Sequence, residues 1–320
     1  MMKPFSLPYT ARRVLLGTST HEQLATFLAA HRPDLEVRGA PFVNITPDQL
    51  AWADTYVGFK RPPGAASMGA VRWVHCTGAG VDSWLAGDGL DPRILLTRTP
   101  ESFGPMIAEW AVARMFAFQQ QLLDVARAQR EHKWAPREVS FVAGTRALVL
   151  GTGDIGSAIA ALLTGLGCDV TGVSRTGSRG SPAFSAVHTV DKLASLVGGV
   201  QWIVITLPIT PATHKLFSRD VMQHCRGAVL LNAGRGAVVD QGALPEALAN
   251  GWLRGAALDV FETEPLPAES PLWRDERVMI SPHISGITTI EGAGNGFLEC
   301  LTSLAQGVLP RWTVDRERGY

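Results

Sequence analysis

Short apolar runs alternate with stretches of helical periodicity along the first hundred residues. The run RVLLGT, from Arg13, ends in turn residues as a buried strand does, and VRWVHC from Val71 and RILLTRT from Arg93 have the same character. Between them, HEQLATFLAAH from His21 and TPDQLAWA from Thr46 carry apolar residues at helical spacing. This alternation predicts an α/β unit in which helices cover both faces of a parallel sheet.

A second series of apolar runs follows Arg146, and most of its members are separated by a helical stretch. The runs are RALVLG, CDVTGVSR, QWIVITLP, GAVLLNAG, GAALDVFE and RVMISPH. Each has the length and composition of a buried strand, so the series predicts a second α/β unit. Turn residues collect in TPESFGP, residues 99–105, and we place the break between the two units there.

The stretch after His283 is too short to form a domain of its own. Its helical pattern places four apolar residues on one face: Phe297, Leu298, Leu301 and Leu304. That face must pack on a unit that already exists, and we expect the N-terminal unit to provide the surface. The first domain then consists of residues 1–101 and 284–320, and the second consists of residues 102–283.

A long helical pattern begins at Pro105 and continues to Trp134. Apolar residues lie around much of its circumference, and a helix of this kind is buried on more than one side. Packing between domains, packing at a subunit interface and packing in a core would each satisfy the pattern, and these alternatives stay open.

The composition excludes several classes of protein. Hydrophobic residues make up 46% of the 320 residues and charged residues 18%, which is too apolar for a disordered chain. Lys plus Arg and Asp plus Glu both number 29, and a net charge of zero argues against a general nucleic-acid binder. With no signal peptide and no membrane-spanning run, we expect a cytoplasmic protein. The four cysteines show no zinc-binding spacing, so we expect neither a metal site nor a disulfide framework.

The segment GTGDIG, from Gly151 to Gly156, matches the G-x-G-x-x-G pattern of dinucleotide-binding proteins. It follows the apolar run RALVL and precedes the helical stretch SAIAALLTGLG, which is the context that the motif requires. Gly151 permits the tight turn, Gly153 lets the backbone approach a pyrophosphate, and Gly156 lets helix and strand pack closely. A plain strand-to-helix turn is the alternative.

The second strand of this unit ends in GVSRTGSR, where an NAD site normally carries an acidic residue for the ribose 2′-hydroxyl. Asp169 lies at the opposite end of the strand, and Ser174, Arg175 and Thr176 stand where the acidic residue is expected. A guanidinium pairs well with a phosphate, so these residues favour NADP(H), with NAD(H) as the second choice. Arg179 is a further candidate, and a solvated loop is the alternative.

Three polar residues follow apolar strands in the second half of the chain: Arg235 in LNAGRGAVVD, Glu264 in LDVFETEPLP and His283 in MISPHISG. The carboxyl ends of strands in an open α/β sheet line the ligand crevice. Reduction of a keto acid by hydride needs a cation, a proton donor and a partner that orients the donor, and these residue types supply all three. Singly, they also suit a surface ion pair, a helix start and a hydrogen-bonded core histidine.

Six segments, in order, resemble the NAD(P)-dependent D-2-hydroxyacid dehydrogenase family, and most closely its glyoxylate/hydroxypyruvate reductases. The segments are HCTGAGVDSW, GTGDIG, TLPITPATHKLF, LLNAGRGAVVD, ALDVFETEPLP with SPLW, and SPHISG. Together they span most of the chain from Arg72 to Gly286. The resemblance implies an α/β fold of two Rossmann-like domains, in which a dinucleotide-binding parallel sheet is inserted into a flavodoxin-like substrate domain.

The resemblance also implies roles for individual residues. Arg235 binds the carboxylate and keto oxygen of the substrate, His283 protonates the carbonyl, and Glu264 orients His283. The substrate carboxylate is also held by backbone N–H groups of a short loop: Gly78, Ala79 and Gly80. Beyond Ser174, Arg175 and Thr176, the implied cofactor-binding residues are Gly151, Gly153, Asp154, Ile155, Gly156, Leu207, Pro208, Ala233, Asp259 (for the carboxamide), Met106 and Gly286.

The implied function is NADPH-dependent reduction of a small 2-keto acid to the D-2-hydroxy acid by a homodimer. The chain departs from related reductases in TYVGFKRPPG, where Phe59 or Lys60 could reach the substrate or lie in a plain surface loop. A dimer formed by the long helix would let Trp134 enter the partner's active site. The alternative function is a non-catalytic, dinucleotide-sensing corepressor on the same fold, which can retain Arg, Glu and His. Formate dehydrogenases are less similar because they pair the histidine with glutamine, where this chain has Glu264.

Overall fold

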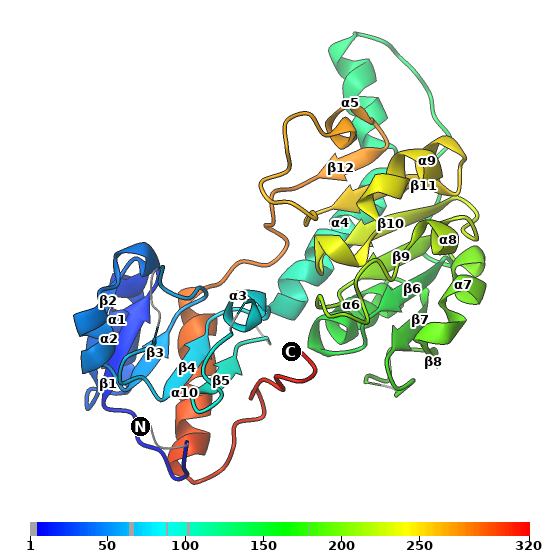
Figure 1. Ribbon diagram of the computed structural model, residues 1–320. Coiled ribbons are helices and arrows are strands. Elements are labelled where there is room, and N and C mark those ends of the chain that lie inside the picture. The colour runs from blue at the N-terminus through cyan, green and yellow to red at the C-terminus, as the bar shows by residue number, and fades with distance from the viewer. Residues whose placement is uncertain (1–4, 64–66, 88, 101–102, 179) are drawn as a thin grey trace. The chain divides into compact units, whose positions relative to one another are not determined.

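The computed structural model describes residues 5–63, 67–87, 89–100, 103–178 and 180–320. The chain divides into two compact units, each built around one parallel sheet (Figure 1). Unit 1 comprises Met1–Ser102 with Thr288–Tyr320, and unit 2 comprises Phe103–Ile287. The C-terminal residues therefore belong with the N-terminal ones.

Unit 1 contains a five-stranded sheet in the order β2-β1-β3-β4-β5, which is the order of flavodoxin-like folds. Its strands are β1 (Arg13–Gly17), β2 (Glu36–Ala40), β3 (Thr55–Val57), β4 (Trp73–Cys76) and β5 (Leu95–Arg98). Its helices are α1 (His21–His31), α2 (Pro47–Trp52), α3 (Asp82–Leu85) and α10 (Ile290–Ala305). Thr46 and Gln49 form a capping box at the start of α2, which fixes where this helix begins.

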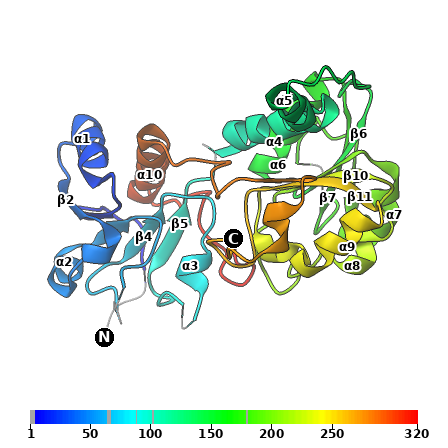
Figure 2. The same cartoon turned by 90° about the horizontal axis from the view of Figure 1, so that it is seen from above.

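Two apolar clusters, one on each face of the sheet, hold unit 1 together. Along β1, Leu15 joins Tyr56 in one cluster, whereas Val14 and Leu16 join the other. Side chains that alternate along a buried strand produce this division. Helix α10 contributes its apolar face to the second cluster and lies beside α1 (Figure 2). This position confirms the packing expected for the helical pattern at the end of the chain.

Unit 2 contains a seven-stranded parallel sheet in the order β12-β11-β10-β9-β6-β7-β8. Successive strands are added towards one edge from β6 to β8 and towards the other edge from β9 to β12. The strand order therefore reverses between β6 and β9, as in doubly wound dinucleotide-binding folds. The strands are β6 (Arg146–Leu150), β7 (Asp169–Ser174), β8 (Ala186–Thr189), β9 (Trp202–Ile205), β10 (Ala228–Asn232), β11 (Leu253–Leu258) and β12 (Val278–Ile280). The two parallel sheets confirm the expected fold class.

Helices cover both faces of the unit 2 sheet (Figure 2). The first group is α4 (Gly104–Gln119) and α6 (Asp154–Gly165), with α5 (Leu122–Arg130) following α4, and the second is α7 (Leu193–Leu196), α8 (Arg219–Met222) and α9 (Leu244–Ala249). Helices α4 and α6 pack against each other, and α8 packs against both α7 and α9.

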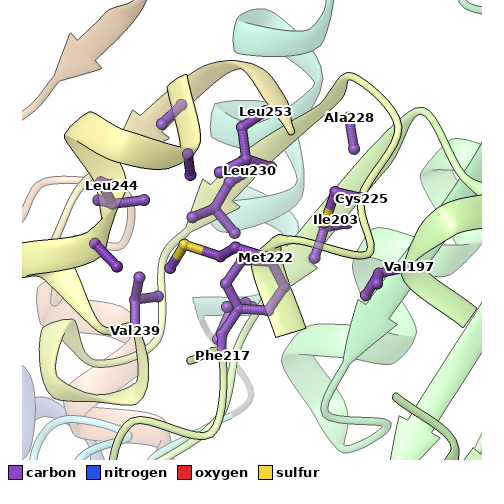
Figure 3. Packing of buried hydrophobic residues seen from close by; sticks show 14 of the residues in the cluster. Val197, Ile203, Phe217, Met222, Cys225, Ala228, Leu230, Val239, Leu244 and Leu253 are labelled. Carbon is purple, nitrogen blue, oxygen red and sulfur yellow. The ribbon is translucent and has the colours of Figure 1, made fainter. Parts of the chain in front are cut away.

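The main core of unit 2 lies between the sheet and the second group of helices. Ile203, Leu230 and Leu253 of three strands meet Phe217 and Met222, which come from the segment between β9 and β10 (Figure 3). All five are buried, and each large apolar side chain contributes about 1.5–3 kcal/mol when it leaves water. This packing fixes the strands whose carboxyl ends carry the candidate site.

The structure corrects one element that the sequence predicts. The pattern from Pro105 to Trp134 predicts a continuous helix, whereas the chain forms α4 and then α5. Gln121 between them has a φ of 50°, a left-handed conformation through which a right-handed helix does not continue. Helix α4 buries part of its surface, including Ile107, Trp110 and Met115, but α5 buries no residue, and its Leu122 and Leu123 are half exposed. The apolar pattern of α5 therefore belongs to a surface.

Candidate functional site

The glycine-rich segment lies where β6 ends and α6 begins. Gly151 has a φ of 106°, which residues with a side chain rarely adopt. A Cβ on Gly156 would lie 1.8 Å from the Gly151 carbonyl oxygen, so only glycine permits this contact between helix and loop. A Cβ on Gly153 would meet nothing within 4 Å, so open space adjoins the loop. Asp154 and Ile155 begin α6, and the free N–H groups of such a first turn bind phosphate. The loop fits a pyrophosphate.

The end of β7 carries the residues expected at the 2′-phosphate of the cofactor. Ser174 is the last residue of the strand, and its buried Oγ has no hydrogen-bond partner among the described residues. Arg175 and Thr176 follow and are exposed, and Thr176 Oγ1 donates a hydrogen bond to Ser178 Oγ at 2.8 Å. Arg179 lies outside the described residues. An unpaired hydroxyl beside an exposed guanidinium fits a phosphate group.

His283 and Glu264 form a direct hydrogen bond. His283 Nδ1 and Glu264 Oε2 are 2.8 Å apart, and the other carboxylate oxygen accepts a hydrogen bond from the Phe261 N–H at 3.0 Å. The carboxylate is therefore held between backbone and imidazole. The His283 side chain is 45% exposed. Because Nδ1 is engaged by Glu264, Nε2 is the ring nitrogen that can meet a ligand.

The Asp259 side chain holds the turn that contains His283. Asp259 is completely buried, and its carboxylate accepts hydrogen bonds from Ser281 Oγ (2.6 Å) and from the N–H groups of Ile284 (3.0 Å) and Ser285 (2.8 Å). The His283 N–H donates to the Asp259 carbonyl oxygen at 2.8 Å. His283 itself has a φ of 54°, a conformation that costs roughly 1–2 kcal/mol. The buried carboxylate therefore stabilises a strained turn, and its contact with the nicotinamide carboxamide stays a prediction.

Arg235 follows β10 in a turn that Asn232 stabilises. The Asn232 Nδ2 donates to the Arg235 carbonyl oxygen, and its Oδ1 accepts from the Gly234 N–H, both at 3.1 Å. A Cβ on Gly236 would lie 1.9 Å from the carbonyl carbon of Phe261, so this turn lies directly against the segment after β11. Asn232 is not among the residues that the sequence predicts for the site. A polar residue at the end of an otherwise apolar strand is the signal that points to it.

The remaining cofactor candidates form two groups within unit 2. Leu207 and Pro208 follow β9 and Ala233 follows β10, and all three are half-buried. Met106 is half-buried in the first turn of α4, and a Cβ on Gly286 would contact side chains of the same helix. The first group therefore lies at the carboxyl edge of the sheet, and the second lies along α4. Their contacts with a cofactor stay predictions.

A candidate anion site of unit 1 is the loop that follows β4. A Cβ on Gly78 in this loop would lie 2.5 Å from Phe59 Cε2, so the aromatic ring rests against the glycine backbone. The Phe59 carbonyl accepts a hydrogen bond from Trp84 Nε1 at 3.0 Å, which fixes the aromatic residue in place. Lys60 Nζ instead lies 5.7 Å from the centre of the Phe42 ring. Of the two residues expected to reach the substrate, Phe59 is the one that contacts the loop.

Three further properties concern the described part of the chain. There, no three histidine, cysteine, aspartate or glutamate side chains come together in a group that could hold a metal ion. No helix within those residues combines the length and the apolar character needed to cross a membrane. All four cysteines are buried free thiols.

The amino-acid sequence is similar to those of known proteins. The family described as "D-isomer specific 2-hydroxyacid dehydrogenase, NAD binding domain" matches residues 112–285. Glyoxylate/hydroxypyruvate reductase A of Serratia proteamaculans is 31% identical over 275 residues, which cover 81% of this chain and 86% of that protein.

Structural comparison gives the same result over nearly the whole chain. A D-isomer specific 2-hydroxyacid dehydrogenase from Xanthobacter autotrophicus Py2, solved with NADPH and MES, has a TM-score of 0.87 and is 31% identical, covering 97% of this chain and 100% of that one. An NADPH-dependent glyoxylate/hydroxypyruvate reductase from Sinorhizobium meliloti, solved with NADP and sulfate, has a TM-score of 0.84 and is 26% identical, with the same coverage.

Proposed function

Because the chain belongs to the D-isomer specific 2-hydroxyacid dehydrogenase family, and is thus an oxidoreductase, we propose that it uses NADPH to reduce a small 2-keto acid of the glyoxylate or hydroxypyruvate type to the D-2-hydroxy acid. The observation that carries the proposal is the 2.8 Å hydrogen bond between His283 Nδ1 and Glu264 Oε2. This pair combines an imidazole, which can act as a proton donor, with a carboxylate that orients it.

His283 is the proposed general acid. The Glu264 carboxylate fixes the ring orientation and stabilises the imidazolium through its opposite charge. The Nε2 proton then passes to the carbonyl oxygen of the substrate as negative charge develops there. The Asp259 side chain limits the motion of the ring because it holds the turn on both sides of His283.

Arg235 is the proposed cation of the site. A guanidinium binds a carboxylate through two parallel hydrogen bonds and also stabilises charge that develops on a neighbouring oxygen. The Arg235 Nη1 donates to the Gly234 carbonyl oxygen at 2.8 Å, which orients the side chain from within its own turn. The Asn232 amide supports the same turn, so the guanidinium is placed before a substrate arrives.

The cofactor, when bound, supplies the hydride. The open space beside Gly153 and the start of α6 support binding of its pyrophosphate. The unpaired Ser174 hydroxyl and the exposed Arg175 support recognition of a 2′-phosphate, and thus a preference for NADPH over NADH. The two structurally similar proteins that were solved with NADPH and with NADP support binding of the phosphorylated cofactor.

The loop after β4 is the proposed second binding site for the substrate carboxylate. Backbone N–H groups of Gly78, Ala79 and Gly80 bind the anion, since a glycine-rich backbone allows close approach. The Phe59 ring lies against Gly78 and limits the space beside the loop, which favours a small substrate.

The function is tested by following NADPH and NADH oxidation with glyoxylate, hydroxypyruvate, pyruvate and bulkier 2-keto acids. We expect turnover with the small acids and a higher kcat/KM with NADPH. His283→Ala should lower kcat by about 10²- to 10⁴-fold, which is the usual contribution of a general acid. His224→Ala removes an exposed histidine of the same unit and should leave kcat unchanged.

Full activity of His283→Ala, or no turnover with any of the acids, would show the proposal to be wrong. Tight NADPH binding without turnover would instead support the dinucleotide-sensing alternative. A higher kcat/KM with NADH would contradict the role given to Ser174 and Arg175.

A further inference from the structure

Three consecutive carbonyl oxygens in the loop after β4 accept hydrogen bonds from neighbouring groups. The bonds run from the Thr99 N–H to Gly78 (3.3 Å), from Arg98 Nη1 to Ala79 (2.8 Å) and from Cys76 Sγ to Gly80 (3.4 Å). The bond from Arg98 is the shortest, and its donor carries a full positive charge. Hydrogen bonds from charged donors are about twice as strong as neutral ones. The hydrogen bond from Arg98 is therefore the strongest of the three that fix this loop.

These bonds determine where the N–H groups of the loop point. A trans peptide unit is planar, and its N–H points opposite to its carbonyl. Holding the carbonyls of Gly78 and Ala79 therefore directs the N–H groups of Ala79 and Gly80 away from Thr99 and Arg98. None of the described residues accepts a hydrogen bond from these two N–H groups. Successive N–H groups directed to one side form a binding site for an anion.

Contacts of the Arg98 backbone with two neighbouring segments fix its position. It is the last residue of β5 and pairs in register with Cys76 of β4, and its N–H donates to the Trp312 carbonyl oxygen at 3.1 Å. Its side chain is half-buried and extends from this fixed backbone to the Ala79 carbonyl oxygen, to which the guanidinium donates. An arginine held in this way loses little further conformational entropy when it forms the bond.

A buried network around His75 stabilises the strand end that carries Arg98. His75 Nδ1 is hydrogen-bonded to Thr97 Oγ1 and Nε2 to Thr99 Oγ1, both at 2.8 Å. Trp73 Nε1 donates to the same Thr97 oxygen at 2.8 Å. All of these side chains are buried, so a shift of residues 97–99 would break hydrogen bonds that water could not replace.

We propose that Arg98 is a positioning residue for the substrate anion. Its guanidinium holds the Ala79 carbonyl so that the N–H of Gly80 is directed at the substrate carboxylate, and its charge adds positive potential beside the loop. The inference rests on the proposed function for the identity of the anion, but the geometry that carries it is that of unit 1 alone. Arg98 therefore acts on substrate binding through the backbone of the loop.

Arg98→Met tests this assignment, because it keeps an unbranched side chain while removing the donor and the charge. We expect the KM for glyoxylate to rise about 10- to 100-fold, which corresponds to the loss of one hydrogen bond from a charged donor. The value of kcat should change much less, and the Kd for NADPH should not change, because the phosphate loop belongs to unit 2. Arg98→Lys returns a charged donor and should restore part of the lost affinity.

Arg316→Met is the matched control. Arg316 also donates to backbone carbonyls of unit 1, those of Leu90, Asp91 and Ile94, but none lies in the loop after β4. We expect this variant to lower the Tm and to leave the KM unchanged. If Arg98→Met lowers the Tm but leaves the KM at the wild-type value, the proposal is overturned and Arg98 is structural.

A binding measurement separates this inference from the proposed function. Oxalate is a small dicarboxylate that cannot be reduced by hydride in this way. It is titrated calorimetrically into three NADP-loaded proteins: the wild type, Arg98→Met and Arg316→Met. If the wild type reduces no keto acid yet binds oxalate, weaker binding by Arg98→Met alone still supports the inference, and equal binding overturns it. A wild type that binds no oxalate and reduces no keto acid overturns both proposals.

Discussion

Gly153 and Gly156 belong to the same glycine-rich loop between β6 and α6 but have opposite surroundings. A Cβ on Gly156 would lie 1.8 Å from a backbone oxygen, whereas a Cβ on Gly153 would meet nothing within 4 Å. We expect Gly156→Ala to destabilise the protein by about 1–3 kcal/mol, because the backbone must move. Gly153→Ala should leave the Tm unchanged and weaken NADPH binding, since its methyl group enters the space for the pyrophosphate. Thermal unfolding and NADPH fluorescence titration measure the two effects. Equal Tm losses in both variants would contradict this division.

His75 makes the stability of the protein depend on pH. Complete burial lowers its pKa to about 3, from an ordinary value of about 6.5. Between these values the unfolded chain binds a proton at His75 and the folded chain does not, so stability is lost as the pH falls below 6.5. We expect His75→Gln to lose less stability than the wild type between pH 7 and pH 5. His31→Gln, at an exposed position, should behave as the wild type does. Equal losses in all three proteins would contradict the assignment.

At the scale of single residues, the sequence predicts the candidate catalytic residues but not the groups that support them. Arg235, Glu264 and His283 could be selected because each polar type follows an apolar strand. Glu264 and His283 are 19 residues apart, and their hydrogen bond depends on how two neighbouring strands end. The support from Asp259 was not visible either, because its partners are mainly backbone N–H groups, which leave no pattern in the sequence.

At the scale of elements, most strands that the sequence predicts are interior strands of their sheets, and the edge strands β5 and β12 were predicted as well. Strands β2 and β8 are at the ends of their sheets and are half exposed, and β3 is only three residues long. None of them carries an apolar run of the length that marks a buried strand, so none was predicted. The central strands β1, β6, β9 and β10 bury nearly every residue, and their sequences show it directly.

The break between α4 and α5 leaves no local signal in the sequence. Helical periodicity continues across Gln120 and Gln121, and both residues are compatible with a helix. The chain turns there because the junction between α4 and α5 is held to the segment that follows α5: Gln120 Nε2 donates to the Ser140 carbonyl oxygen (3.2 Å). Contacts that join residues 20 apart decide where this helix ends, and local propensity contains no record of them.

At the scale of the whole molecule, α5 and the segment to residue 141 carry a set of exposed apolar side chains in unit 2. Its members are Leu122, Leu123, Val125, Trp134, Val139 and Phe141, of which Trp134 is 95% exposed and Phe141 is 83% exposed. Most monomeric proteins do not expose a contiguous group of large apolar side chains, and such groups mark sites of association. Symmetric pairs are the commonest assemblies of soluble proteins, so a second copy of the chain is the occupant that we expect.

We therefore expect the protein to be a homodimer that loses its partner when this surface becomes charged. Leu122→Asp combined with Leu123→Asp should convert the dimer to a monomer in size-exclusion chromatography with light scattering, because association would bury two unpaired carboxylates on each chain. Both side chains are half exposed and α5 buries no residue, so the substitutions should leave the fold intact. Leu309→Asp, at a similarly exposed apolar position in unit 1, should remain a dimer. A wild-type monomer would show that α5 does not pair two copies, and a doubly substituted chain that stays dimeric would place the interface elsewhere.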